Sequence, residues 1–114
     1  MDPALRAKLD DAHQARINGE YDRARELYEE LLGASSEPKE EAEVHWGLGL
    51  VLQFTGLFDE CLVELEAAAA GDPDNAGFLL DLAKTRIMLG DYDLVRRCPN
   101  TPEAQEARKQ LSYF

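Results

Sequence analysis

A four-residue phrase that recurs three times constrains the fold of this chain more than any other feature. It reads Gly-Glu-Tyr-Asp at 19–22, Gly-Leu-Phe-Asp at 56–59 and Gly-Asp-Tyr-Asp at 90–93. The glycines that open the three phrases are separated by 37 and then by 34 residues. A recurrence of this length is typical of stacked helix–turn–helix units, each of which buries its apolar stripe only against its neighbours.

Glycine and proline positions divide the chain into helices. Glycine after a helix permits the left-handed backbone that ends it, and proline is favoured at the first helical position. Glycines at 19, 33, 56, 71 and 90 stand at such ends. We therefore expect about seven helices, over residues 3–18, 21–32, 39–55, 58–70, 75–89, 92–98 and 104–113. The polar linker 33–38 accounts for the longer first interval.

The last stretch departs from this rhythm. A helix that begins near Tyr92 meets Pro99 after about two turns, and a proline inside a helix costs ~3 kcal/mol. Thr101-Pro102-Glu103 then offers a new helix start. We expect a short second helix in the third unit, followed by a C-terminal helix over 101–113 that caps the exposed end of the stack.

The middle unit resembles the tetratricopeptide repeat (TPR) family. The residues that match the family pattern there are Leu48, Gly49, Gly56, Phe58, Cys61, Leu65, Ala68 and Pro73. His45 stands where the family has tryptophan, and Trp46 follows one residue later. The first unit matches mainly in its second half, at Gly19, Tyr21, Ala24 and Tyr28. The third matches in its first half, at Leu79, Leu82, Ala83, Gly90 and Tyr92.

This resemblance implies an all-α fold, a right-handed superhelical stack of about three TPR units in a single domain over residues 1–114. The units cover about residues 5–35, 42–74 and 76–99, and the capping helix covers 101–113. In such a stack a small residue such as Ala24 or Cys61 lets the two helices of a hairpin approach closely. Tyr28 or Leu65 fills the gap to the next unit.

The resemblance also implies that the first helix of each unit lines a concave wall that binds a partner. Counting back from each turn glycine gives the partner-binding candidates Leu9, His13, Arg16, Trp46, Leu50, Gln53, Phe54, Leu80, Lys84 and Ile87. An apolar wall with an aromatic anchor and a basic rim is typical of a peptide or helix groove. Two readings stay open for Trp46 and Leu50, which either face the groove or belong to the core.

One known use of the family is a clamp for a C-terminal carboxylate, made from Lys, Asn and Arg side chains on this wall. The matching positions here are Leu9, His13, Gly47, Gly77 and Asp81, and only His13 among them can donate to a carboxylate. We therefore do not expect a carboxylate clamp.

The net charge of −11 narrows the classes of partner. Phosphate contacts need a basic face, so the charge argues against nucleic acid and against anionic membrane surfaces. Two interpretations of this negative charge remain. It belongs to a solvated outer face, or it produces a field that steers a basic partner. The composition, 45% apolar and 31% charged, fits a globular protein. Without a basic-then-apolar leader we expect a cytoplasmic location, with Cys61 and Cys98 as core residues in a reducing compartment.

Residues for catalysis are few. Adjacent acids are most simply solvated helix faces, and His13 and His45 lie in different units, without a nucleophile at a readable spacing. We interpret His45 as a packed core histidine. No glycine-rich phosphate-binding loop is expected, and no zinc spacing is present. We expect no enzyme activity, no cofactor and no metal.

Two functions remain. The first is an interaction module or scaffold whose concave, rather apolar groove takes a peptide or helix of another protein. The second is a structural self-association module, a homo-oligomer formed through the groove or the C-terminal end. The apolar terminus Leu111-Ser112-Tyr113-Phe114 bears on this choice, since it can cover its own core, fill its own groove or dock into a second copy.

Overall fold

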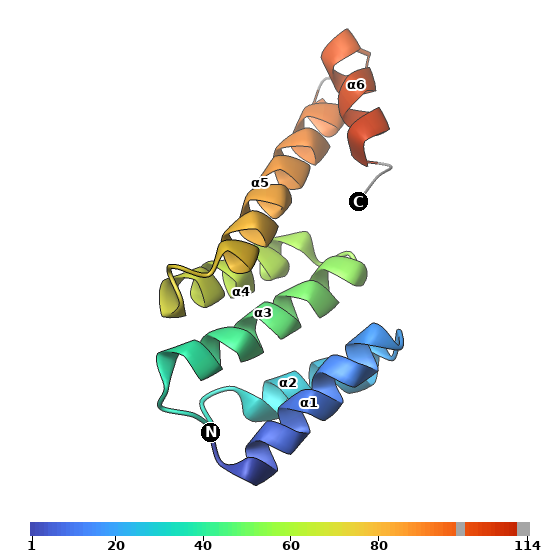
Figure 1. Ribbon diagram of the computed structural model, residues 1–114. Coiled ribbons are helices and arrows are strands. Elements are labelled where there is room, and N and C mark those ends of the chain that lie inside the picture. The colour runs from blue at the N-terminus through green and yellow to red at the C-terminus, as the bar shows by residue number, and fades with distance from the viewer. Residues whose placement is uncertain (98–99, 112–114) are drawn as a thin grey trace.

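The computed structural model describes residues 1–97 and 100–111, and this part of the chain consists of helices joined by turns and loops, with no strand (Figure 1). The all-α class is therefore confirmed. The helices are α1 (Pro3–Ile17), α2 (Tyr21–Leu31), α3 (Pro38–Phe54), α4 (Phe58–Gly71), α5 (Ala76–Arg97) and α6 (Pro102–Leu111). Within the described residues, none of them is both long and apolar enough to cross a bilayer.

Local sequence signals set both ends of α1. The side chain of Asp2 accepts a 2.8 Å hydrogen bond from the amide of Ala4, and a proline occupies the first turn. Past the other end, Gly19 adopts a φ of 80°, and the amide of Glu20 donates to the carbonyl of Ala15. Gly56 has a φ of 83° and ends α3 in the same way. These two predicted turns are confirmed, because only glycine adopts this backbone at little cost.

The turn predicted at Gly90 is wrong. Gly90 is absent from the glycines with positive φ, and α5 continues through it to Arg97 as one helix of 22 residues. The two helices expected over 75–89 and 92–98 are thus merged, and the described residues form six helices instead of about seven. Glycine permits a left-handed turn but does not impose one, and each further helical residue adds a backbone hydrogen bond. The predicted break at Pro99 lies outside the described residues.

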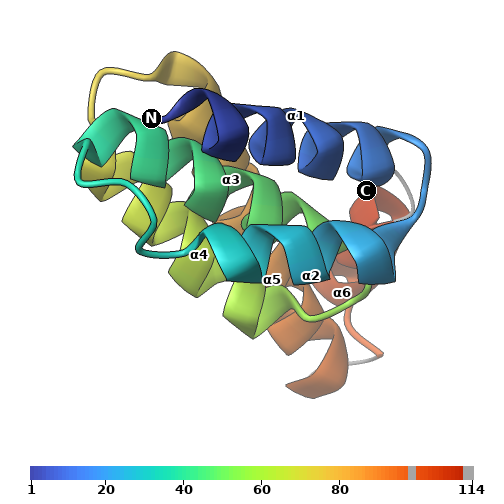
Figure 2. The same cartoon turned by 90° about the horizontal axis from the view of Figure 1, so that it is seen from below.

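The helices pack in chain order. α1 and α2 form one hairpin, α3 and α4 form a second, and α2 and α1 both pack on α3. α5 packs on α4 and carries α6 beside its distal end (Figure 1). The view from below shows the N-terminal hairpin lying over α3 and α4 (Figure 2). The result is an elongated body of 53 × 29 × 18 Å.

Two glycines in α3 mark where neighbouring helices come closest. A Cβ added to Gly47 would lie 2.4 Å from the ring of Tyr28, and one added to Gly49 would lie 2.9 Å from Leu65. Tyr28 and Leu65 are both fully buried. Ala24 and Cys61, the small residues of α2 and α4, are also 0% exposed, as the sequence predicted. The aromatic ring of one hairpin therefore fills a space that the next hairpin leaves by lacking a side chain.

The C-terminal helix packs against α5. The hydroxyl of Thr101 accepts a 3.1 Å hydrogen bond from the amide of Ala104 and so begins α6. Ala104 and Ala107 are buried on α6, and Met88 is buried on α5. The small alanine side chains let α6 lie close to α5. The predicted continuation of this helix beyond Leu111 falls outside the described residues.

Candidate interaction surface

Trp46 joins three helices at the centre of the predicted wall. Its indole Nε1 donates a 2.8 Å hydrogen bond to the carboxylate of Asp81 on α5. The indole ring stacks on Phe78, with ring centroids 5.6 Å apart and 27° between the planes. Both partners come from the first two turns of α5, so Trp46 links α3 to α5. A buried indole needs a partner for its N–H, and Asp81 provides it.

Two side chains of α1 cover Trp46 from the other side. The guanidinium carbon of Arg16 lies 5.0 Å from the centre of the indole, within the range of a cation–π interaction. The ring of His13 meets the indole edge-on, with centroids 5.9 Å apart. The indole is therefore held between α1 and α5. We call Trp46 with these four partners the Trp46 cluster.

A chain of hydrogen bonds runs beneath this cluster. Arg16 Nε donates to the hydroxyl oxygen of Tyr28 at 3.2 Å, and that hydroxyl lies 2.5 Å from His13 Nδ1. His13 Nε2 lies 3.2 Å from a carboxylate oxygen of Glu43. Because a carboxylate only accepts, Nε2 is the protonated nitrogen, and Tyr28 donates to Nδ1 in the neutral ring. Burial raises the pKa of Tyr28, so the phenol keeps its proton.

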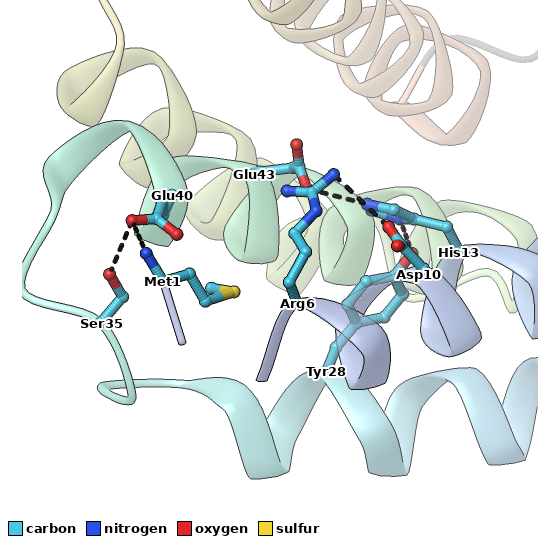
Figure 3. Close-up of polar contacts among 8 residues, drawn as sticks. All are labelled: Met1, Arg6, Asp10, His13, Tyr28, Ser35, Glu40 and Glu43. Atoms are coloured by element: carbon cyan, nitrogen blue, oxygen red, sulfur yellow. Dashed lines mark hydrogen bonds and ion pairs between the residues drawn. The ribbon is translucent and has the colours of Figure 1, made fainter. Parts of the chain in front are cut away.

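Glu43 on α3 anchors the outer end of this chain. Its carboxylate contacts Arg6 Nη1 at 2.9 Å as well as His13, and Arg6 also lies 3.4 Å from Asp10 (Figure 3). The hydrogen bond to His13 lowers the pKa of Glu43, with a further contribution from Arg6. The carboxylate therefore stays ionised, and it ties α1 to α3.

The predicted wall residues are placed unequally. Leu9 is 0% exposed and belongs to the core, so its assignment as a partner-contacting residue is wrong. The apolar stripe of α1 that packs on α2 includes Leu9, which removes it from the surface. A further set of five residues is half-buried: His13, Arg16, Trp46, Leu50 and Gln53. The remaining four are exposed: Phe54, Leu80, Lys84 and Ile87.

The exposed apolar residues of the predicted wall and their neighbours fall into two separate groups. Phe54 is 63% exposed and stacks on Tyr21, with centroids 5.5 Å apart and 9° between the rings. Ile17, 67% exposed, is the last residue of α1 and precedes Tyr21 by four positions. We call Ile17, Tyr21 and Phe54 the Phe54 patch. Sequence reasoning missed Tyr21 as a surface residue because Tyr21 was used only as a turn signal and as a match to the repeat pattern.

The second group lies along α5. Leu80 and Ile87 are each 55% exposed and are separated by two helical turns. Ile87 is nine residues from the buried Phe78, which places the two on opposite sides of an α-helix. Phe78 is the residue that stacks on Trp46. Leu80 and Ile87 therefore face away from the Trp46 cluster, and the predicted wall is two surfaces instead of one. We call Leu80, Ala83 and Ile87 the α5 stripe.

The second histidine has a different partner. His45 is half-buried, and its Nδ1 lies 2.6 Å from the carboxylate of Glu64 on α4. The hydrogen bond that His45 donates to Glu64 raises the pKa of His45, and burial only partly opposes it. The two histidines have separate carboxylate partners. Among the described residues no three His, Cys, Asp or Glu side chains gather in a way that could hold a metal ion.

Comparisons with models of known protein families, with curated proteins and with solved structures found no match. The surface chemistry is therefore the basis for a functional assignment. The surface includes the Trp46 cluster, the exposed aromatic and aliphatic side chains of the Phe54 patch, and the aliphatic side chains of the α5 stripe. Such a surface is suited to holding another apolar surface.

Proposed function

We propose that this protein is a protein-interaction module of the TPR kind, a right-handed superhelical stack that binds a segment of a partner protein. The observation that carries this proposal is the Phe54 patch, in which Phe54 and Ile17 are each more than half exposed. Exposed apolar side chains that gather at one place on a folded chain mark an interaction site more often than isolated ones do.

The Trp46 cluster fixes α3, the helix that carries Phe54, against α1 and α5. Trp46 is engaged through its N–H, its edge and its ring faces, so its role is to hold α1, α3 and α5 in place. Phe54 lies two turns further along α3 than Trp46, and Leu50 lies between them. A rigid base of this kind lowers the ordering cost when a partner binds.

The partner segment is an amphipathic helix or peptide that covers the Tyr21–Phe54 pair with apolar side chains. Arg16 is the half-buried cation over the indole of Trp46, two helical turns from Phe54 along α3. Aromatic pairs with an adjacent arginine are the residue types that dominate the energy of helix and peptide grooves. No step of this function requires a cofactor or a reaction.

Site-specific photocrosslinking tests this proposal. Benzoylphenylalanine is placed at position 54 and, as a control, at the exposed position 103 on α6. In an extract of the cells that make the protein, we expect one dominant covalent adduct from position 54 and none from position 103. An excess of the protein without benzoylphenylalanine should prevent formation of this adduct by competition, whereas an excess of the Phe54→Asp variant should not. The same adducts from both positions would contradict the proposal.

Self-association is the second candidate, and the α5 stripe favours it. Leu80, Ala83 and Ile87 form an exposed apolar line on the side of α5 opposite its buried residues. Two copies could bury this line by pairing their α5 helices. Light scattering coupled to gel filtration, over a concentration series, decides between the candidates. A dimer that Ile87→Glu dissociates and Phe54→Asp does not would support pairing, and a monomer at all concentrations would exclude it.

A further inference from the structure

The structure has a groove whose lining does not include the residues of the Phe54 patch. It has a volume of about 310 Å³ and runs between α2 and α4, with α3 beneath. The residues that line it are Arg25, Glu29, Leu32, Leu48, Leu52, Glu60, Val63 and Glu64. Leu52 and Phe54 are two residues apart on α3, about 200° around the helix axis. Leu52 of the groove and Phe54 of the patch therefore lie on different sides of α3, and on α2 the patch residue Tyr21 lies one turn before the groove residue Arg25.

The base of the groove is apolar. Leu48 and Leu52 are 4% and 3% exposed, and they form the floor. Val63 on α4 is 62% exposed, and Leu32 at the end of α2 is 37% exposed, so both present aliphatic surface to the opening. The volume is at the lower end of the range of ligand sites, about 300–1,000 Å³. The groove accommodates a few side chains and is too small for a large cofactor.

Its rims are acidic. Glu29 stands on α2, and Glu60 and Glu64 stand one turn apart on α4. Arg25 is the single cation among the lining residues. The whole of α4 has four carboxylates and neither lysine nor arginine. With a net charge of −11 on the chain, the potential over this groove attracts a cation.

Arg25 bridges the groove but leaves one carboxylate weakly held. Its Nε donates a 2.8 Å hydrogen bond to Glu29 on its own helix. Its Nη2 lies 3.7 Å from Glu60 on α4, which is longer than a hydrogen bond. The side chain of Glu60 is 58% exposed. An incoming cation can therefore pair with Glu60 and displace only its weak contact with Arg25.

We propose that this groove binds a basic amphipathic segment of a partner protein. Aliphatic side chains of the segment lie on Leu48, Leu52 and Val63, and a lysine or arginine beside them pairs with Glu60. The occupant is argued from charge complementarity, since an apolar floor between acidic rims excludes an acidic segment and favours a basic one. The proposal does not depend on the Phe54 patch, and the two surfaces together would let one chain hold two partners.

Fluorescence anisotropy with a defined probe tests this proposal. The probe is a fluorescein-labelled amphipathic helical peptide built from leucine and lysine, and its counterpart is built from leucine and glutamate. Two variants with equal charge change are compared, Val63→Lys in the groove and Leu79→Lys on α5, at side chains that are 62% and 46% exposed. We expect Val63→Lys to weaken binding of the lysine peptide about tenfold, and Leu79→Lys to change it less than about twofold.

A second pair of variants tests the charge. Glu60→Gln should weaken binding of the lysine peptide and reduce its dependence on salt, whereas Glu103→Gln on α6 should do neither. Thermal unfolding of each variant shows that it is folded. Equal losses from Val63→Lys and Leu79→Lys, no loss from Val63→Lys, or tight binding of the glutamate peptide would each overturn the proposal. None of these results bears on the crosslinking from position 54, so the two proposals fail separately.

Discussion

The indole N–H of Trp46 donates a 2.8 Å hydrogen bond to the carboxylate of Asp81, and this bond joins α3 to α5 across 35 residues of sequence. Both side chains are half-buried, so the bond is partly shielded from water. Phe78, one turn before Asp81, stacks on the same indole. Trp46 therefore adds a direct link between α3 and α5, a helix that otherwise packs on α4.

Replacing Trp46 with phenylalanine should lower the free energy of unfolding by about 1–2 kcal/mol, because a ring remains but Asp81 loses its donor. Urea unfolding followed by circular dichroism measures this. The control is a double-mutant cycle with Asp81→Ala. We expect the sum of the free-energy losses of the two single variants to exceed the loss of the double variant by about 1 kcal/mol. Strict additivity would show that the bond does not couple the two helices.

Replacing Gly47 with alanine should lower the free energy of unfolding by about 1–3 kcal/mol, as overpacking of a core does. The new methyl group would lie 2.4 Å from the ring of Tyr28. That ring cannot move aside freely, since its hydroxyl is held by His13 and Arg16. Urea midpoints of the two proteins give the difference. A neutral effect would mean that Tyr28 does not pack against this point of α3.

Replacing Gly90 with alanine should have the opposite sign and raise the free energy of unfolding by about 0.5–1 kcal/mol. Gly90 lies inside α5, and a Cβ added there meets nothing within 4 Å. Thermal and urea unfolding measure the change. If the chain instead turned at Gly90 with a positive φ, alanine would be strained and the variant would lose stability. The sign of the change in the free energy of unfolding therefore shows whether residues 76–97 form one long helix or a third hairpin.

The contribution of the His45–Glu64 pair to stability should depend on pH. The pKa of His45 is raised in the folded protein above its ordinary 6.5, so the folded state holds the proton more tightly than the unfolded state. The stabilisation is fully present below pH 6.5 and is lost as the pH rises through the raised pKa. We expect His45→Gln to lower the free energy of unfolding by about 1 kcal/mol or less at pH 5.5, and by less at pH 9.

The matched control for this pH dependence is Glu64→Gln, which removes the partner and leaves the histidine. Both variants should converge towards the native protein at high pH, as measured by urea unfolding at each pH. A difference that grows with pH would contradict the raised pKa, because it would require the folded protein to prefer the neutral ring.

The thiol of Cys61 should react slowly. It is 0% exposed, and burial raises its pKa, so little thiolate is present or accessible at neutral pH. In a Cys98→Ser background, which leaves a single thiol, we expect alkylation by iodoacetamide at least about a hundredfold slower in the folded protein than in urea. Equal rates in both conditions would show that α4 opens readily from α3 and α5.

Much of the N-terminal two thirds could be predicted from the sequence, because its signals are local. Gly19 and Gly56 end helices through hydrogen bonds that span only a few residues, and Asp2 begins one in the same way. The small residues Ala24 and Cys61 are buried as predicted, since helical periodicity places them on the inner face. Such features depend on neighbours along the chain, so the amino-acid sequence by itself determined them.

Tertiary contacts decided the rest. The phrase around Gly90 is almost the same as the phrase around Gly19, yet one glycine turns and the other continues the helix. Glycine allows both conformations at similar cost, and Met88 finds burial in the continuous helix, where α6 packs with Ala104 and Ala107.

The partners of Trp46 were decided in the same way. Asp81 and Phe78 lie about one repeat further along the chain, and no local rule selects them. Local sequence signals set which residues form helices and where most of these helices end. Only the packing of helices far apart in the chain decided which side chains meet and which apolar residues remain exposed, because burial depends on what covers a residue.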